Sequence, residues 1–330
     1  MSDNNVILSI QNLSKEFKLR GEGLFAKPQV LHALSDISLD VYEGETLGII
    51  GESGCGKSTL GRCIVGLHTP TSGKVVFEGT DIASLKGAAR KPVSKNIQMI
   101  FQDSYSSLDP RFTAAAAIEE PMLIHGTELD AAKRQERVLQ LMKEVGLDVQ
   151  HLQRYPHEFS GGQRQRINVA RALSLDPKII VCDEPVSALD VSIQAQVLNL
   201  FRRLQRERGL TYVFISHDLS VVKHISDRVA IMYLGRVMEI SPAHSIYENP
   251  LHPYTKALLS AIPPENPFER HPEMKLEGEI PSPVGDQVGC PLAGRCPNAT
   301  ERCHRERPAL VETEPDHKVA CFLYHDEVAE

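Results

Sequence analysis

The pattern of apolar and polar residues predicts strands and helices that alternate along most of the chain. Alternating apolar and polar positions predict half-buried strands at 6–12 and 36–41. Continuous apolar runs predict strands buried on both faces at 46–50, 96–101, 178–184 and 211–215. Apolar residues at helical spacing predict helices at 58–65, 163–173 and 191–208. Such alternation of buried strands with helices is typical of an α/β fold.

A helical block between about residues 103 and 175 interrupts this alternation. Apolar residues recur there at helical spacing, at Val138, Leu141, Met142 and Val145. We predict that Pro121 and the pair Gly126-Thr127 divide the block into separate helices. The block is therefore predicted to be a helical subdomain inserted into the α/β core.

The last part of the chain has a different character. Two short apolar runs, at 229–233 and 235–240, predict a hairpin. From Pro263 onward, prolines are frequent and the apolar periodicity fades. This change predicts a first domain at 1–262 and a C-terminal extension at 263–330. No tandem repeat is visible, so we expect a single copy of the core.

Length, charge and hydropathy limit the class of protein. The 330 residues suffice for one large or two ordinary domains, and 42% hydrophobic with 24% charged residues is typical of globular proteins. The net charge of −7 gives no electrostatic argument for nucleic acid. No apolar run approaches the roughly eighteen residues of a membrane span, and the N-terminus lacks the pattern of a signal peptide. We therefore expect a cytosolic chain with reduced cysteines.

One glycine-rich segment, residues 51–59, fits the phosphate-binding pattern G-x-x-x-x-G-K-[ST]. A predicted strand leads into it and a predicted helix leads out, which is the context that a P-loop requires. Glycines let backbone N–H groups point at an anion, and the helix N-terminus adds partial positive charge. Lys57 would reach the β- and γ-phosphates, and Ser58 would ligate Mg²⁺. The candidate phosphate-binding residues are Gly51, Ser53, Gly54, Cys55, Gly56, Lys57, Ser58 and Thr59.

Two carboxylates end the buried run at 178–184. In P-loop ATPases an aspartate at a strand end holds Mg²⁺, so Asp183 is the candidate metal ligand. Glu184 follows it and could orient or deprotonate the attacking water. The alternative is a strand that simply leaves the core, but the P-loop upstream favours the catalytic interpretation.

A second glycine turn precedes a predicted helix at Ser160, Gly161, Gly162 and Gln163. Paired glycines expose backbone N–H groups, and Ser160 can cap the helix, so the turn could bind a second anion. One nucleotide does not need two such turns in one chain. Two chains packed head to tail would use both, the P-loop of one and this turn of the other.

The order of these segments resembles the ATPases of ABC transporters. The Ser-Gly-Gly-Gln turn lies between the P-loop and the strand with Asp183, where the family has its signature motif. Gln102 resembles the Q-loop glutamine, residues 187–190 resemble the D-loop, and His217 resembles the switch histidine. Phe17 lies where the family stacks an aromatic ring on adenine. The resemblance covers about residues 6–260 and implies a P-loop fold with an antiparallel β subdomain and an inserted helical subdomain.

The resemblance also implies roles for these residues. Lys57, Ser58 and the backbone of 53–56 would bind ATP and Mg²⁺, with Gln102 and Asp183 completing the metal and water site. Glu184 would be the general base, and His217 would contact the γ-phosphate. Residues 160–163 would bind ATP held by an opposing subunit.

Three further segments are similar to ATPase subunits of bacterial dipeptide and oligopeptide importers. These segments are residues 105–110, 154–159 and 249–255. An insertion near residues 21–28 is similar to the F-type subunit, which pairs with a distinct D-type ATPase. The resemblance implies two transmembrane permease subunits, an extracytoplasmic substrate-binding protein and a peripheral location on the cytoplasmic face of the inner membrane. Glutathione and nickel are alternative cargoes, since relatives serve those importers too.

Four cysteines gather in the C-terminal extension, at Cys290, Cys296, Cys303 and Cys321. In a cytosolic chain, clustered thiols favour a metal over disulfides. Their gaps are wider than those of typical zinc sites and differ from ferredoxin spacing. Four thiolates can still hold a [4Fe–4S] cluster, and similar tails in peptide-importer ATPases suggest one. An iron–sulfur cluster, zinc and reduced cysteines without metal remain open.

Two other classes of protein compete with a transport ATPase. The first is a soluble ABC ATPase that acts on DNA or the ribosome. Such proteins often carry two ATPase modules or long coiled-coil insertions, which this sequence lacks. The second is a regulatory module with a degenerate ATP site, which the presence of Lys57, Asp183, Glu184 and His217 disfavours.

Overall fold

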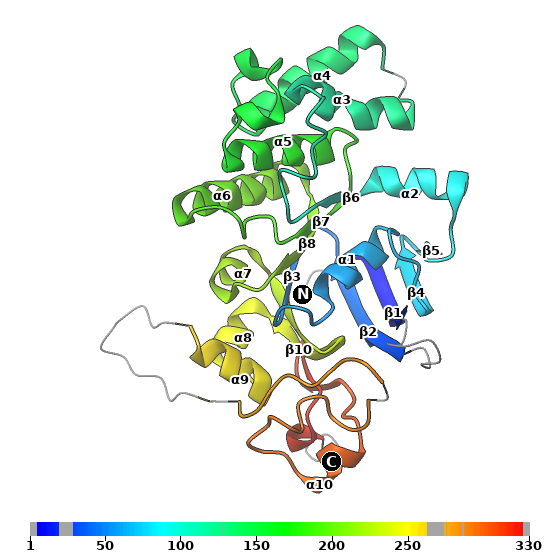
Figure 1. Ribbon diagram of the computed structural model, residues 1–330, viewed down its shortest axis with the longest axis vertical. Coiled ribbons are helices and arrows are strands. Elements are labelled where there is room, and N and C mark those ends of the chain that lie inside the picture. Colours follow the sequence, from blue (N-terminus) through cyan, green and yellow to red (C-terminus); the bar gives the residue numbers. More distant parts are fainter. Residues whose placement is uncertain are drawn as a thin grey trace, which may run out of the picture. The chain divides into compact units, whose positions relative to one another are not determined.

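The computed structural model describes residues 5–19, 29–127, 129–262, 274, 276–285 and 287–325 (Figure 1). Its contacts divide the chain into two compact units. The first unit contains Tyr42–Thr46 and Ser84–Ser216, and the second contains Val6–Val41, Leu47–Ala83 and the residues from His217 onward. The insertion predicted near residues 21–28 lies outside the described residues.

The first unit contains parallel strands in the order β8-β7-β6. They are β6 (Ile97–Ile100), β7 (Ile179–Asp183) and β8 (Thr211–Ser216). Every residue of β7 and β8 is buried, as the continuous apolar runs predicted. Parallel pairing brings Asp183 beside Ile215, so the carboxyl ends of β7 and β8 meet at one edge. The unit also contains α6 (Val191–Arg208), α2 (Lys91–Asn96) and a 3₁₀ turn, η1 (Gly87–Arg90).

Three helices of the first unit form the predicted helical block, seen in green in Figure 1. They are α3 (Ala114–His125), α4 (Ala131–Glu144) and α5 (Gly161–Leu173), and two 3₁₀ turns, η2 (Val149–His151) and η3 (Pro156–Glu158), lie between α4 and α5. The predicted break at Pro121 is wrong, because α3 runs through it. Pro121 is buried, and packing of α3 on its neighbours offsets the lost backbone hydrogen bond. The break at Gly126 is confirmed, since Gly126 ends α3 in a left-handed conformation.

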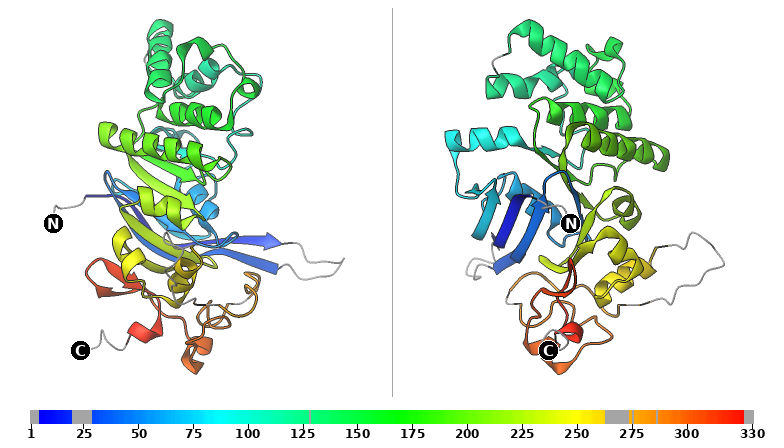
Figure 2. Two further views of the ribbon diagram at one scale, coloured as in Figure 1. Left: turned by 90° about the vertical axis from the view of Figure 1, so that its left-hand side faces the viewer. Right: turned by 180° about the vertical axis from the view of Figure 1, so that it is seen from behind.

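The second unit contains an antiparallel sheet in the order β2-β1-β4-β5, which Figure 2 shows in dark to light blue. Its strands are β1 (Val6–Leu19), β2 (Gln29–Tyr42), β4 (Ser72–Phe77) and β5 (Thr80–Asp81). The predicted strands at 6–12 and 36–41 are therefore present but longer. The sheet confirms the antiparallel β subdomain.

A second group of strands in this unit has the order β11-β12-β10-β9-β3. They are β3 (Thr46–Ile50), β9 (Arg228–Tyr233), β10 (Arg236–Pro242), β11 (Val311–Glu314) and β12 (His317–Val319). Strands β9 and β10 pair antiparallel and confirm the predicted hairpin. Strand β3 runs parallel to β9. Helices α1 (Lys57–Ile64), α7 (Leu219–Ile225), α8 (Ala243–Glu248), α9 (Pro253–Ser260) and α10 (Glu301–Arg305) and the 3₁₀ turn η4 (Phe322–Tyr324) complete the unit.

The two short strands near the C-terminus continue the sheet from β10. Glu239 lies opposite Val319 in the antiparallel pair of β10 and β12. Beside this pair, the fully buried Glu239 carboxylate contacts His317 Nε2 at 2.7 Å and accepts from the backbone N–H groups of Leu251 and His252. The contact with His317 holds β12 beside β10, and the two backbone contacts hold the segment before α9 there as well. The predicted domain boundary at 262 and 263 stays a prediction.

None of the described helices combines the length and the apolarity that a bilayer crossing requires.

Candidate functional site

The glycine-rich segment joins β3 to α1 as the sequence predicts. Gly54 and Gly56 have φ of +78° and +104°, which is the left-handed region that side chains rarely adopt. A Cβ on Gly56 would lie 2.4 Å from the Ala33 carbonyl oxygen, and one on Gly51 would lie 2.1 Å from that of Met232. Backbone conformation and close packing therefore require glycine at these positions and fix the path of the loop.

Lys57 begins α1 with only 4% of its surface exposed. Its Nζ donates to the carbonyl oxygens of Gly51 and Glu52, at 2.7 and 3.0 Å. The ammonium group is thus held inside the loop by the loop's own backbone. Ser58 and Thr59 follow in the first turn and are half-buried. Ser53 and Gly54 are exposed, whereas Cys55 is buried and its burial raises the pKa of the thiol.

The two carboxylates after the apolar run differ in conformation. Asp183 ends β7 and is 1% exposed. Glu184 follows with φ of +47°, an unusual value for a residue with a side chain. Its N–H donates to the Ile215 carbonyl, and its Oε2 accepts from Gln102 Nε2 at 3.0 Å. The structure therefore brings Gln102 and Glu184 together across 82 positions of sequence.

The Ser160 turn begins α5 with a capping box. Ser160 Oγ accepts from the Gln163 N–H at 3.3 Å, and the Gln163 side chain accepts from the Ser160 N–H at 3.0 Å. A Cβ on Gly162 would lie 2.4 Å from Ile193 Cγ2, and one on Gly161 would lie 3.2 Å from Leu189 Cδ2. These glycines therefore also allow the turn to pack against the segment at 187–193, which sequence reasoning did not predict.

Two further candidates lie at the surface of the second unit. His217 follows β8 and is exposed. Phe17 is half-buried on β1, with its ring edge-on to His68 at 5.5 Å between centroids and under Lys15 Nζ at 4.8 Å. The P-loop and these two residues belong to the second unit, whereas Gln102, the carboxylates and the Ser160 turn belong to the first.

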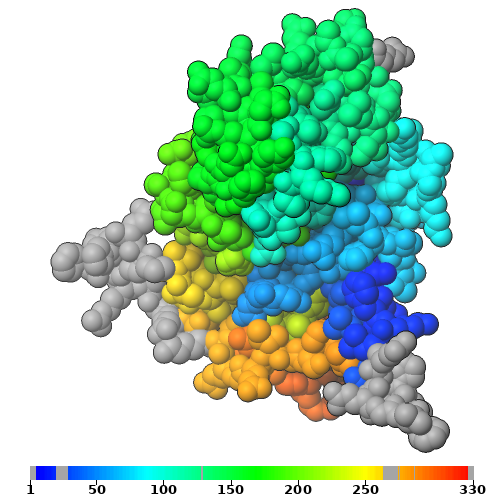
Figure 3. Space-filling view, turned by 45° about the horizontal axis from the view of Figure 1, so that its top comes forward, coloured from blue at the N-terminus to red at the C-terminus, as the bar shows by residue number. Residues whose placement is uncertain are grey.

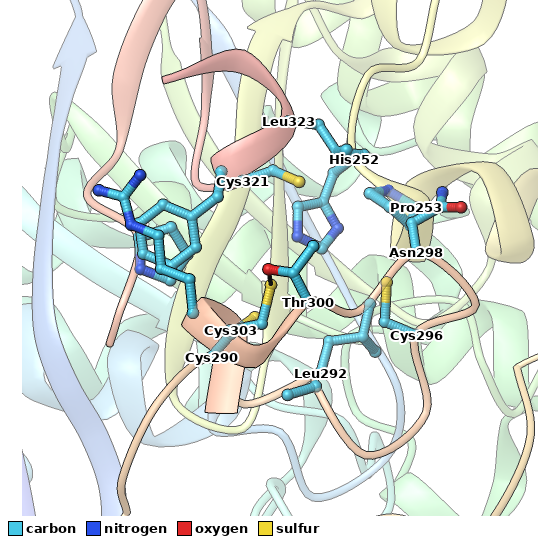
Figure 4. A pocket seen from close by; sticks show the side chains of 14 residues that line it. His252, Pro253, Cys290, Leu292, Cys296, Asn298, Thr300, Cys303, Cys321 and Leu323 are labelled. Carbon is cyan, nitrogen blue, oxygen red and sulfur yellow. Dashed lines mark hydrogen bonds between the residues drawn. The ribbon is translucent and has the colours of Figure 1, made fainter. Parts of the chain in front are cut away.

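All four C-terminal cysteines line one pocket of about 320 Å³, together with His252 and Thr300 (Figure 4). All seven cysteines are free thiols, and those of the pocket are half-buried. The Cys303 sulfur lies 3.3 Å from Thr300 Oγ, and burial, followed by the neighbouring thiols, raises the pKa of Cys290 to about 11. In the described part of the chain, however, no three His, Cys, Asp or Glu side chains are arranged to hold a metal. The donor atoms suit a soft metal, but their arrangement does not form a ligand set.

Sequence reasoning missed three residues that surround the P-loop. The Glu52 N–H donates to the Tyr254 hydroxyl at 3.0 Å. Arg295 Nη1 lies 3.3 Å from Glu52 Oε2 and 3.3 Å from the Tyr233 hydroxyl. No local pattern could have revealed these contacts, because Glu52 is more than 200 positions from Tyr254 and Arg295, and Tyr233 is 62 positions from Arg295.

Comparison with protein families matches two regions of the chain. Residues 34–187 match the family described as ABC transporter. Residues 238–303 match the family described as oligopeptide/dipeptide transporter, C-terminal region. The first match contains the P-loop, and the second contains Tyr254, Arg295 and three of the four pocket cysteines.

Individual proteins are similar over nearly the whole chain. The oligopeptide transport ATP-binding protein AppF of Bacillus subtilis is 50% identical over 98% of this chain and 99% of its own length. The dipeptide transport ATP-binding protein DppF of Haemophilus influenzae is 48% identical over 98% of both chains. Among solved structures, the ATP-binding cassette MJ0796, a dimer bound to ADP and phosphate, has a TM-score of 0.64 and 30% identity over 72% of this chain and 98% of its own. The likeness confirms the ABC cassette fold.

Two matched regions and near full-length relatives agree with the geometry of the P-loop. The chain therefore belongs to the family of ABC-transporter ATP-binding subunits for oligopeptides and dipeptides, which are ATPases coupled to transport.

Proposed function

We propose that this chain hydrolyses ATP to energise the uptake of dipeptides or oligopeptides through separate membrane subunits. The observation that carries the proposal is a P-loop with a buried lysine in a chain about 50% identical to peptide-transport ATP-binding proteins over nearly its full length. The chain would bind peripherally to the cytoplasmic face of the membrane.

Residues of the P-loop would hold the nucleotide. Lys57 would exchange its backbone carbonyl partners for the β- and γ-phosphates, and the N–H groups of 53–56 would point at the same anion. Phe17 would stack on adenine. Mg²⁺ would be held by Ser58, Gln102 and Asp183, and when bound it would neutralise charge that develops on the phosphates.

Glu184 would accept a proton from the attacking water. Its left-handed backbone and its hydrogen bond from Gln102 fix the carboxylate, which suits a group that must act at one position. His217 would contact the γ-phosphate. Catalysis would then rest on positioning and charge rather than on a covalent intermediate.

A second ATPase subunit would complete each site. The capped turn at 160–163 would face the nucleotide held by the opposing subunit, and the dimeric state of MJ0796 agrees with such a pairing. We propose that the partner is a distinct D-type chain. Two permease subunits and an extracytoplasmic binding protein would complete the importer.

The cysteine pocket is the candidate site for a [4Fe–4S] cluster, with zinc and a metal-free lobe as alternatives. Four thiols on one pocket support a metal, whereas their arrangement in the structure does not. Anaerobic purification decides between them. Brown protein with equal iron and sulfide would support the cluster, and colourless, metal-free protein would overturn it.

The test of the proposed function is uptake of labelled dipeptides and oligopeptides by cells that carry the wild-type chain or Lys57→Ala. Labelled glutathione and nickel serve as control cargoes. Loss of peptide uptake alone would support the proposal. Loss of glutathione or nickel uptake instead would reassign the cargo. Unchanged uptake of all three would overturn the peptide proposal and favour a non-transport ABC ATPase.

A further inference from the structure

The P-loop carries a negative charge of its own, at Glu52. A carboxylate beside a polyphosphate site repels the ligand, because like charges a few ångströms apart disfavour each other strongly where water is partly excluded. Glu52 is only 26% exposed, so solvent screens this charge incompletely. Binding of ATP therefore requires that the charge be compensated.

Arg295 supplies the compensating charge from the other end of the chain. Its Nη1 lies 3.4 and 3.3 Å from the two oxygens of Glu52, and its side chain is 12% exposed. The guanidinium is held in place by Tyr233, whose hydroxyl lies at 3.3 Å and whose ring centroid lies at 5.9 Å. Figure 3 shows the orange surface of the C-terminal segment directly beside the blue surface of the N-terminal half of this unit.

Tyr254 fixes the backbone of the same residue. Its hydroxyl accepts from the Glu52 N–H, and its fully buried ring lies 4.7 Å from that of Tyr233. The Glu52 carbonyl in turn accepts from Lys57 Nζ. All polar groups of Glu52 are thus engaged, two of them by the C-terminal region and one by the phosphate-binding lysine.

We propose that Arg295 and Tyr254 are positioning residues for nucleotide binding. Arg295 neutralises Glu52, Tyr254 fixes its backbone, and together they prepare the P-loop to accept a polyphosphate. The proposal rests on the nucleotide role of the P-loop, and it gives the C-terminal region a function in ATP binding.

The test measures the affinity of the purified chain for a fluorescent ATP analogue at low and high salt. Arg295→Gln should weaken binding about fivefold to tenfold at low salt, since an unpaired carboxylate remains beside the phosphates, and the loss should shrink at high salt. Arg295→Lys, which keeps the charge, should bind almost as the wild type does. The double variant Glu52→Gln with Arg295→Gln should recover most of the affinity, because the repulsion is gone.

Tyr254→Phe should weaken binding at all salt concentrations, since it removes a hydrogen bond and no charge. Tyr247→Phe is the matched control, because its hydroxyl contacts Leu219 and not the P-loop. Wild-type affinity in Arg295→Gln, or a double variant no better than Arg295→Gln, would overturn the inference. Lys57→Ala distinguishes failure of this inference from failure of the proposed function. If Lys57→Ala binds the analogue normally, the nucleotide role of the P-loop itself is wrong.

Discussion

At the scale of single residues, the identity of the candidate catalytic side chains could be predicted from the sequence. The backbone conformation of these residues could not. The P-loop pattern and the carboxylates after an apolar run could be predicted, since each combines a residue type with a local context. The left-handed backbone of Glu184 could not, because glutamate carries no preference for it. The same holds for Gly162, whose small size serves the contact with Ile193.

Glu184→Gln should keep ATP binding and lose turnover. The amide retains the size and the contact with Gln102 but cannot accept a proton, so we expect hydrolysis to fall by about 10²–10⁴-fold. Steady-state hydrolysis and nucleotide affinity measured on one preparation check this. Hydrolysis at the wild-type rate would contradict the base assignment.

Gly162→Ala should destabilise the first unit, because its Cβ would lie 2.4 Å from Ile193 Cγ2. We expect a loss of about 1–3 kcal/mol in the free energy of unfolding, measured with urea. Adding Ile193→Ala should recover part of it by removing the clashing atom. Gly161→Ala, with its nearest contact at 3.2 Å, serves as the milder control. Equal losses in both single variants would refute the steric explanation.

At the scale of elements, segments with a clear apolar pattern of their own were predictable, and segments that depend on packing against a neighbour were not. Helix α6 and strand β3 begin and end where the pattern predicts. Strands β11 and β12 have four and three residues, and they form because β10 offers an edge rather than because of their own pattern. Helix α3 shows the same principle, since packing carries it through Pro121.

Helix α9 should weaken in acid through its N-cap residue, His252. His252 Nδ1 accepts from the Tyr254 N–H, so the cap needs a neutral ring. Burial lowers the pKa of His252 from 6.5 to about 4. The unfolded chain therefore binds the proton more readily, and stability that is fully present above pH 6.5 is lost as the pH falls toward 4, by about 3 kcal/mol.

Urea unfolding between pH 7 and 4 measures this loss. His252→Asn is the matched control, since its side-chain oxygen can cap the helix but does not titrate. The wild type should lose more stability than the variant over this range. Parallel pH profiles would show that His252 does not carry the dependence.

At the scale of the whole molecule, the residues that we propose to bind ATP are divided between the two compact units and come from interleaved stretches of sequence. The family resemblance predicted this set because it fixes the order of the motifs. It did not predict that the C-terminal region contacts the P-loop, since contacts across more than 200 residues leave no local pattern. The cysteines were predicted to gather, and they line one pocket, but a metal-binding arrangement does not follow.

Ser160→Arg should separate binding from hydrolysis. If this residue serves the opposing subunit, the isolated chain should bind ATP as the wild type does, while the assembled importer should lose hydrolysis. Loss of the cap should cost only about 1 kcal/mol of stability, which urea unfolding can verify. Weaker ATP binding by the isolated, folded variant would contradict a role toward the opposing subunit.

The burial of cysteines determines which thiols are oxidised first under oxidative stress. Cys55, Cys63 and Cys182 are at most 4% exposed, and burial raises the pKa of each thiol. Burial also raises the pKa of Cys290, Cys296 and Cys321 in the pocket, but the four pocket cysteines are more accessible than the other three. Electrophiles and peroxides react with accessible thiolates, so damage would begin in the C-terminal region while the thiol of the P-loop is spared. Oxidation would therefore reach the region that we propose positions the P-loop before it reaches the P-loop itself.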